Sequence, residues 1–442
     1  MKNFKEILFY ISVCIGLSIS TTAFAVISGL FKNVTGFWAV ITLLLAGTFC
    51  LVISNSVAVL ASIYPTAPGI RTYLKKAFGD KVSLFFVFLY LSFIVMVGSV
   101  ESYMFSVVLK YFVPGVPSIL VIFCILAFVV SVNCYGIELP RGLQMFSTYV
   151  LFAGLAILSI AGIINAQNII EAFRTSAAEV EQWTKVPGSV GMAIFLFVGF
   201  EWVTPMGFGA GSYKWKIPLS MPLAILLNML LYTGFAFGLH LTLTQEVIAA
   251  GTTPQILFAV ETFGTTGAYA GLLLSALAII STFNAGVMGG ARFIFALGRE
   301  GNLPKWTTKI SLTTGVPVGA IITLGSVVFI CSFFVVSFGL ELTFAVVGSA
   351  IICFVYAMLM LALIRLNIEQ KRSDLLFKSK ISRPVQWFFV ALLPILGILS
   401  LFSIPGIYAS AVVCFVLVIV AASIFVKLVG FKKEKRLVSS GQ

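Results

Sequence analysis

The stretch Phe195–Ser220, FLFVGFEWVTPMGFGAGSYKWKIPLS, decides the fold. It begins as an apolar helix and places a carboxylate, Glu201, beside Trp202. It then loses helical character and becomes polar through a series of prolines, glycines and lysines: Pro205, Gly207, Gly209, Gly211, Lys214 and Lys216. A helix can break inside a membrane only where the freed backbone groups face protein, water or a ligand. This broken helix with a buried acid therefore predicts a binding site.

The composition excludes an ordinary soluble protein. Of the 442 residues, 60% are hydrophobic and only 10% are charged, whereas soluble domains are about half apolar and about a quarter charged. Apolar runs of about 20 residues, enough to cross ~30 Å of hydrocarbon, recur along the whole chain. We expect an all-α polytopic membrane protein with 12 transmembrane helices. Besides the opening stretch, the expected spans are Ile7–Phe31, Gly36–Ile63, Val82–Tyr111, Ser118–Glu138, Gly142–Ile164, Leu219–Leu243, Gly267–Leu297, Val318–Phe338, Leu342–Leu363, Val385–Ser403 and Ile407–Leu428.

The basic residues predict the orientation. The net charge is +13, but of the 28 lysines and arginines all except Lys32, Lys110, Arg174 and Lys185 fall on one side if both termini are cytoplasmic. This positive-inside bias predicts a multi-pass protein of the cytoplasmic membrane, with an uncleaved first helix. It leaves no reason to expect nucleic acid as a partner. The basic tail KKEKR (432–436) is expected to meet anionic lipid headgroups.

The sequence predicts neither an enzyme nor a metal site. Seven cysteines lie in expected spans without metal-ligand spacing, and the chain has one histidine, His240. Neither a metal constellation nor a nucleophile arrangement is present in this pattern. We therefore expect no cofactor and no catalytic residues.

An internal symmetry links the opening stretch to the first span. Residues 11–26, ISVCIGLSISTTAFAV, place small and polar residues where apolar ones are expected: Gly16, Ser18, Ser20, Thr21 and Thr22. This pattern fits either small-residue helix packing or an unwound stretch that binds a ligand. Paired broken helices in two halves indicate a transporter's midplane site. We therefore expect two inverted five-helix units, 1–165 and 166–364, followed by residues 365–442 with two further spans and the tail.

Several motifs carry a resemblance to a known family. The most specific is Arg292–Pro304, RFIFALGREGNLP, followed by Gly315–Val318, GVPV. Others are Ala61–Gly69 (ASIYPTAPG) with Tyr73–Gly79 (YLKKAFG), Gly199-Phe200-Glu201 upstream of Ile217-Pro218, and Asn133 with Gly136. Together they resemble the amino acid–polyamine–organocation (APC) transporters. The resemblance covers the first ten spans.

The resemblance implies a fold and a function. It implies a leucine-transporter-type 5+5 inverted repeat, with broken helices one and six and a site between spans one, three, six, eight and ten. Family members carry amino acids or polyamines, either as proton-coupled importers or as exchangers. Spans four and five lack the lysine that many relatives use in place of sodium, Val59 replaces an acid in span two, and Phe208–Tyr213 lacks the family's acids. In the family, two glycines at the first break leave amides that receive a substrate carboxylate; here Ser20–Phe24 has neither glycine, so hydroxyl groups can donate instead.

Two intramembrane carboxylates are functional candidates, because a charged side chain in a bilayer is costly. Burial disfavours the charged form, so Glu201 is a candidate proton carrier or gate; alternatively it is a neutral acid that bridges helices. Glu101 in span three either pairs with a cationic group of the substrate or is solvated at another face.

Other candidates have equally open alternatives. Phe195 and Trp202 gate the pocket or cover a cation by cation–π attraction, or they only pack. Ser281, Thr282 and Asn284 coordinate an ion, line the site or join helices. The predicted substrate-binding residues are Ser18, Ser20, Thr21, Thr22, Glu101, Phe195, Gly199, Glu201, Trp202 and Asn284.

The resulting hypothesis is a secondary transporter that works by alternating access. Proton-coupled import of an amino acid or small amine through Glu201 is the first choice, with the proton favoured over sodium. The alternatives are an amino acid/amine exchanger and, less favoured, a channel or a sensor. Glu101 favours a cationic substrate. The sequence leaves the choice between a monomer and a homodimer open.

Overall fold

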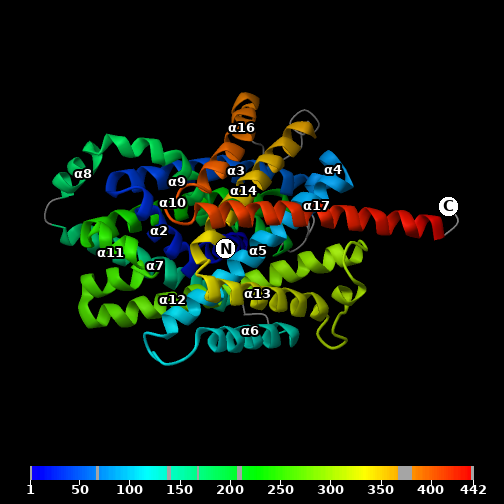
Figure 1. Cartoon of the computed structure of the whole chain (residues 1–442), viewed down its shortest axis with the longest axis horizontal. Coiled ribbons are helices and arrows are strands. Elements are labelled where there is room, and N and C mark those ends of the chain that lie inside the picture. The colour runs from blue at the N-terminus through cyan, green and yellow to red at the C-terminus, as the bar shows by residue number, and fades with distance from the viewer. Residues whose placement is uncertain are drawn as a thin grey trace.

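The computed structural model describes residues 2–65, 69–136, 141–166, 169–206, 212–366 and 381–439. The elements assigned within these ranges are all helices, as predicted (Figure 1). The first half contains α1 Lys2–Ser18, α2 Thr21–Asn33, α3 Gly36–Ile63, α4 Gly69–Phe78, α5 Asp80–Leu109, α6 Ser118–Cys134, α7 Arg141–Asn165, α8 Ile169–Ala178, η1 Val180–Lys185, α9 Val186–Ala193, η2 Ile194–Phe197 and η3 Phe200–Met206. The second half contains η4 Ser212–Lys216, α10 Ile217–Thr242, α11 Gln245–Ala250, α12 Pro254–Arg299, η5 Lys305–Thr308, α13 Val318–Phe338, α14 Glu341–Arg365, α16 Arg383–Ser400 and α17 Tyr408–Ser439.

The helix lengths fit a membrane protein. Within the described ranges, ten helices are long and apolar enough to cross a membrane, and the bent pair α1–α2 makes eleven. The apolar helix α6 lies where the fourth span was expected, but it is shorter than these. The count of twelve spans therefore stays a prediction, as do the divisions after residues 165 and 364.

The helices differ in how deeply they are buried. In its most apolar window, α14 is 78% buried inside the protein, whereas α17 is only 11% buried. Large apolar side chains of α17 are exposed between residues 413 and 428: Val413, Val416, Leu417, Val420, Ile424 and Leu428. An exposed apolar surface of this extent indicates contact with lipid. α14 is therefore a core helix of the bundle, and α17 lies at its periphery.

The two ends of the bundle carry different elements. α8 and α11 lie at one end, whereas α4 and the C-terminal end of α17 lie at the other (Figure 1). At the second end, Arg71 of α4 is buried and its Nη2 donates to Glu300 Oε2 at 2.7 Å and to Asp80 Oδ1. Glu300, which belongs to the motif Arg292–Pro304, thus forms an ion pair with an arginine of α4. Arg299 instead lies over the ring of Phe295, at 5.9 Å.

The first span is interrupted between α1 and α2, which are bent by 53°. Ser20 at the break is extended (φ −122°, ψ 165°), and its hydroxyl oxygen accepts a hydrogen bond from Ala23 N at 3.1 Å. A serine in this position caps a helix N-terminus. The stretch is therefore unwound at Ser20, and ligand binding by it stays a prediction.

The sixth span breaks earlier than predicted. The helical chain of α9 and η2 ends at Phe197, and Gly199 follows with a φ of 124°. Only glycine adopts this backbone readily, and a Cβ at Gly199 would also lie 2.8 Å from Leu17 Cβ. The break is therefore placed by the close approach of α1, whereas the predicted breaker Pro205 lies inside η3. Gly207, Gly209 and Gly211 lie outside the described residues, and Lys214 and Lys216 lie in η4.

Candidate binding site at the two helix breaks

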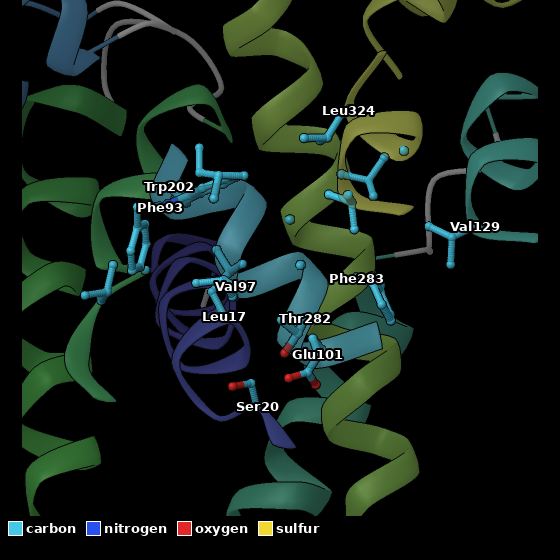
Figure 2. Close-up of a pocket in the computed structure, with 18 of the residues that line it drawn as sticks. Leu17, Ser20, Phe93, Val97, Glu101, Val129, Trp202, Thr282, Phe283 and Leu324 are labelled. Carbon is cyan, nitrogen blue, oxygen red and sulfur yellow. The ribbon is translucent and has the colours of Figure 1, made fainter. Parts of the chain in front are cut away.

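A cavity lies where the two breaks meet α5, α6, α12 and α13 (Figure 2). Its lining is mostly apolar and includes Val97, Val129, Phe283 and Leu324. Six of the ten predicted site residues also line it: Ser18, Ser20, Glu101, Phe195, Gly199 and Trp202. Of the other four, Thr21 and Thr22 begin α2, Glu201 lines a second cavity, and the side chain of Asn284 lies outside the described part.

The two breaks are joined directly. The Ser18 hydroxyl donates to the carbonyl oxygens of Val198, at 2.9 Å, and Cys14, at 3.0 Å. Tyr232 of α10 donates its hydroxyl to the carbonyl oxygen of Ser18 at 2.7 Å. Freed backbone groups in an apolar setting need such partners. These bonds hold both breaks at one depth in the bundle and leave the cavity beside them.

Glu101 closes the N-terminus of α2. Its Oε1 accepts from Thr21 N at 3.1 Å, and its Oε2 accepts from Thr22 N at 2.9 Å and from the Thr22 hydroxyl at 2.7 Å. The side chain is fully buried. Unpaired N–H groups and the helix dipole make a helix N-terminus an anion site. In this protein, the anion is a carboxylate of its own chain.

Glu201 has a different set of partners. Tyr90 of α5 donates its hydroxyl to Oε1 at 2.8 Å, while Tyr356 of α14 and Gly199 N donate to Oε2, each at 3.2 Å. The carboxyl group lines a smaller cavity that also contains Gly69 and Ile70 of α4. Glu201 therefore lies beside the second break, toward α4, and the main cavity is lined by its neighbour Trp202.

Trp202 forms a wall shared by the two cavities. Its indole lies against Gly289 of α12, where a Cβ would come within 2.0 Å of Trp202 Cε3. The rings of Phe93 and Phe195 meet edge to face at 5.7 Å between their centroids. Figure 2 places Trp202 and Phe93 at one end of the cavity and Glu101 at the other. The cavity thus has an aromatic end and a polar end.

The polar residues of α12 divide into two roles. The Ser281 hydroxyl donates to Gly16 O at 3.2 Å and accepts from the side-chain amide of Gln144 at 2.9 Å. Ser281 therefore joins helices. Thr282 lines the cavity, is 6% exposed, and its hydroxyl oxygen has no hydrogen-bond partner in the described part of the chain. In Figure 2 this hydroxyl lies beside the oxygens of Glu101.

Sequence reasoning missed the partners of the two carboxylates. Tyr90 and Tyr356 were not singled out, because tyrosines in apolar spans carry no distinctive pattern of their own. A row of residues on one face of α5 could have identified Tyr90 from the sequence. Tyr90, Phe93, Ile94, Val97 and Glu101 recur at spacings that place them on one helix face, and all of them line one of the two cavities.

These features define the class of protein. Two broken helices around a buried cavity in an apolar helical bundle describe a multi-pass membrane protein with the leucine-transporter-type fold. The structure of a mutant of the manganese transporter of Eremococcus coleocola is similar, with a TM-score of 0.63 over 98% of this chain and 95% of that one. At 10% identity, this likeness concerns the fold alone. The model of the amino acid permease family matches residues 5–432, and the chain belongs to that family.

Curated relatives agree with this assignment. An uncharacterized amino acid permease of Bacillus subtilis, YecA, is 26% identical over 285 residues, which are 62% of this chain and 64% of the relative. The chain thus matches just under two thirds of that relative's length. The aromatic amino acid transport protein AroP of Corynebacterium glutamicum is 24% identical over 398 residues, 83% of this chain and 80% of that protein. The resemblance seen in the motifs is confirmed.

Proposed function

We propose that this protein is a secondary active transporter that moves an amino acid or a related small amine across the cytoplasmic membrane by alternating access. The observation that carries the proposal is the cavity at the meeting point of both broken spans, lined by Ser20, Glu101 and Gly199. Broken helices in the two halves of a transporter form its midplane binding site. Membership of the amino acid permease family supports the same reading, and so does the fold shared with a transporter. Both termini are placed in the cytoplasm by the positive-inside rule.

We propose the proton as the coupling ion, with Glu201 as its carrier. The carboxyl group is 4% exposed and adjoins the small cavity beside α4. A buried carboxyl group can bind and release a proton without leaving a stable charge in the bilayer. Sodium is disfavoured because the hydroxyl of Ser281, one of the ion-ligand candidates, is already engaged by Gly16 O and Gln144.

Exchange without proton coupling is the second candidate. The observation that favours it is that the two oxygens of Glu201 receive three donors, from α5, α14 and the second break. A carboxyl group held in this way can act as a structural link between these elements without carrying a proton. Transport would then exchange one substrate for another.

A cavity-filling variant tests the transport site. Gly286 lines the cavity, and a Cβ added there meets no atom within 4 Å. Gly286→Val therefore adds side-chain volume beside the cavity at a position where the Cβ itself meets no atom, and counterflow in proteoliposomes loaded with a panel of amino acids and amines should fall at least tenfold. Gly430→Val on α17 is the matched control, because Gly430 is equally unobstructed but lies away from the cavity. Unchanged counterflow in Gly286→Val would place the substrate elsewhere.

A pH gradient distinguishes coupling from exchange. In proteoliposomes, an inward proton gradient should drive accumulation by the parent, whereas Glu201→Gln should accumulate nothing above equilibrium yet retain counterflow. Accumulation that is unchanged in Glu201→Gln removes this residue from the coupling step. Counterflow without any response of the parent to the gradient favours the exchanger.

A further inference from the structure

We infer that Glu101 fixes the substrate class: the cavity takes a primary amine with an apolar body and no carboxylate. This inference rests on the proposed function and names the substrate of the same site. It comes from three features of the cavity, namely the occupied helix end of α2, the lack of a cationic side chain paired with Glu101 among the described residues, and the acceptors around Glu101.

The groups that would receive a ligand carboxylate are already bonded. Half-helix N-termini in transporters point at anionic groups of substrates. The start of α2 is such an end, and the N–H groups of its first two residues, Thr21 and Thr22, donate to Glu101. An entering carboxylate would find these amides taken and would meet a like charge, which is repulsive in an apolar setting. The first break thus rejects the group that distinguishes an amino acid from its amine.

The charge of Glu101 calls for a cation. No lysine or arginine forms an ion pair with it among the described residues, where the ion pairs involve Arg71, Lys75 and Lys216. An ammonium group in the cavity would place a full positive charge beside this carboxylate.

The acceptors at the polar end match an ammonium group. Glu101 Oε1 receives one hydrogen bond and keeps a free lone pair, because a carboxylate oxygen can accept two. The Thr282 hydroxyl has no partner in the described part, and the Ser20 oxygen accepts only from Ala23 N. In Figure 2 the Thr282 hydroxyl lies beside the oxygens of Glu101, whereas the Ser20 oxygen points away from them. Glu101 and Thr282 thus offer adjacent acceptors for the N–H donors of a primary ammonium.

The rest of the cavity fits an apolar body. From the polar end it passes Val97 and Phe283 and reaches the rings of Phe93 and Trp202 (Figure 2). Predominantly apolar walls with a few placed polar groups are the usual form of a small-molecule site. A branched alkylamine or an arylalkylamine places its head at Glu101 and its body against these side chains.

Matched pairs of ligands test the inference on the full-length protein purified in detergent. The probes are 3-methylbutylamine against leucine and 2-phenylethylamine against phenylalanine, since each pair shares one apolar body and differs in the carboxylate. Titration should give at least tenfold tighter binding of the amine in each pair. Equal binding within both pairs, tighter binding of the amino acids, or binding of neither amine would overturn the inference.

Variants assign the preference to named groups. Glu101→Gln keeps the shape and removes the charge, so amine affinity should fall at least tenfold. Thr282→Val removes one acceptor and should weaken amine binding several-fold, whereas Thr233→Val should leave it unchanged. Thr233 of α10 is a matched control, because its hydroxyl is also buried and unpartnered within the described residues but does not line the cavity. Amine affinity that is unaffected by Glu101→Gln contradicts the assignment.

Transport by the same preparation separates this inference from the proposed function. Uptake of the amino acids in preference to the amines overturns the inference and leaves a transporter. Selective binding of the amines without uptake or counterflow of any probe supports the inference and overturns the proposed function.

Discussion

The two helix breaks are each closed by a carboxylate, but the two carboxylates are held differently. Glu101 extends from α5 to the backbone of α2 and binds two N–H groups that cannot move without unwinding that helix. Glu201 belongs to the broken segment itself, and two of its three donors are tyrosine hydroxyls. α5 serves both sites, since Tyr90 and Glu101 are eleven residues apart and three helical turns place them on one face.

Glu101 is held by the backbone of a helix, whereas Glu201 is held mainly by side chains that can move. A carboxylate held by the backbone of a helix end keeps its position while that helix is intact, which suits the recognition of a ligand. Tyrosine hydroxyls on α5 and α14 leave the carboxyl group when either ring rotates or either helix shifts, which suits a group that exchanges a proton or reports a movement. Under the proposed function, a glutamate would therefore serve binding at one break and coupling at the other.

Charge reversal should give the largest contrast between the breaks. Glu101→Lys places an ammonium against the N–H groups of α2, which repel it and lose their acceptor, and breaking a buried charged contact costs about 3–5 kcal/mol. Glu201→Lys costs less, because the oxygens of Tyr90 and Tyr356 can accept from the ammonium. The two variants are compared by the yield of monodisperse protein and by the midpoint of thermal unfolding. A lower midpoint for Glu201→Lys than for Glu101→Lys would reverse the comparison.

Truncation should give the next largest difference. Glu101→Ala leaves two buried N–H groups unpaired, at about 1–3 kcal/mol for each unsatisfied group. Glu201→Ala frees only one N–H group, that of Gly199. Unfolding in a graded series of denaturing detergent should therefore place Glu101→Ala below Glu201→Ala. Glu101→Gln should lie nearer the parent, because an amide oxygen still accepts; equal stability of all three variants would mean that α2 does not depend on this cap.

Removal of single donors should have smaller and separable effects. Tyr90→Phe should cost about 1 kcal/mol, and Tyr356→Phe less, since their distances to Glu201 are 2.8 Å and 3.2 Å. Both should shift the pH dependence of uptake. Thr22→Val removes the hydroxyl donor to Glu101 and should change substrate affinity without moving the pH profile. A shift of the pH profile in Thr22→Val would show that the two carboxylates share one function.

The fold could be predicted from the sequence because its determinants are local. α3 (Gly36–Ile63) and α13 (Val318–Phe338) begin and end at the residues predicted for them, since a run of apolar residues of membrane length is itself the signal. The position of the second break could not be predicted in this way. It depends on Leu17 lying against Gly199, a contact between residues far apart in the chain. Pro205, the breaker expected from the sequence, lies inside η3.

The site could be predicted only in part, for a related reason. Glu101 and Glu201 are conspicuous because charged residues are rare in apolar spans. Their partners are not conspicuous: Tyr90 and Tyr356 are two of 13 tyrosines, and the donors of Thr21 and Thr22 include backbone N–H groups that no residue type reveals. Sequence alone therefore suggested that the hydroxyl groups of the first break would face a ligand. In the structure, the Thr22 hydroxyl donates to Glu101.

The N-cap of α2 should give the smallest effect and the finest test of the comparison. Ser20→Ala removes the hydroxyl oxygen that accepts from Ala23 N, and loss of such a cap costs about 1 kcal/mol. Because Glu101 still holds Thr21 and Thr22, the helix end should survive, and thermal unfolding should fall by only a few degrees. Ser382→Ala is the matched control, since Ser382 precedes α16 without a side-chain cap bond and its loss should be within about 0.5 kcal/mol. A Ser20→Ala variant as unstable as Glu101→Ala would show that the serine, and not the carboxylate from α5, holds the first break.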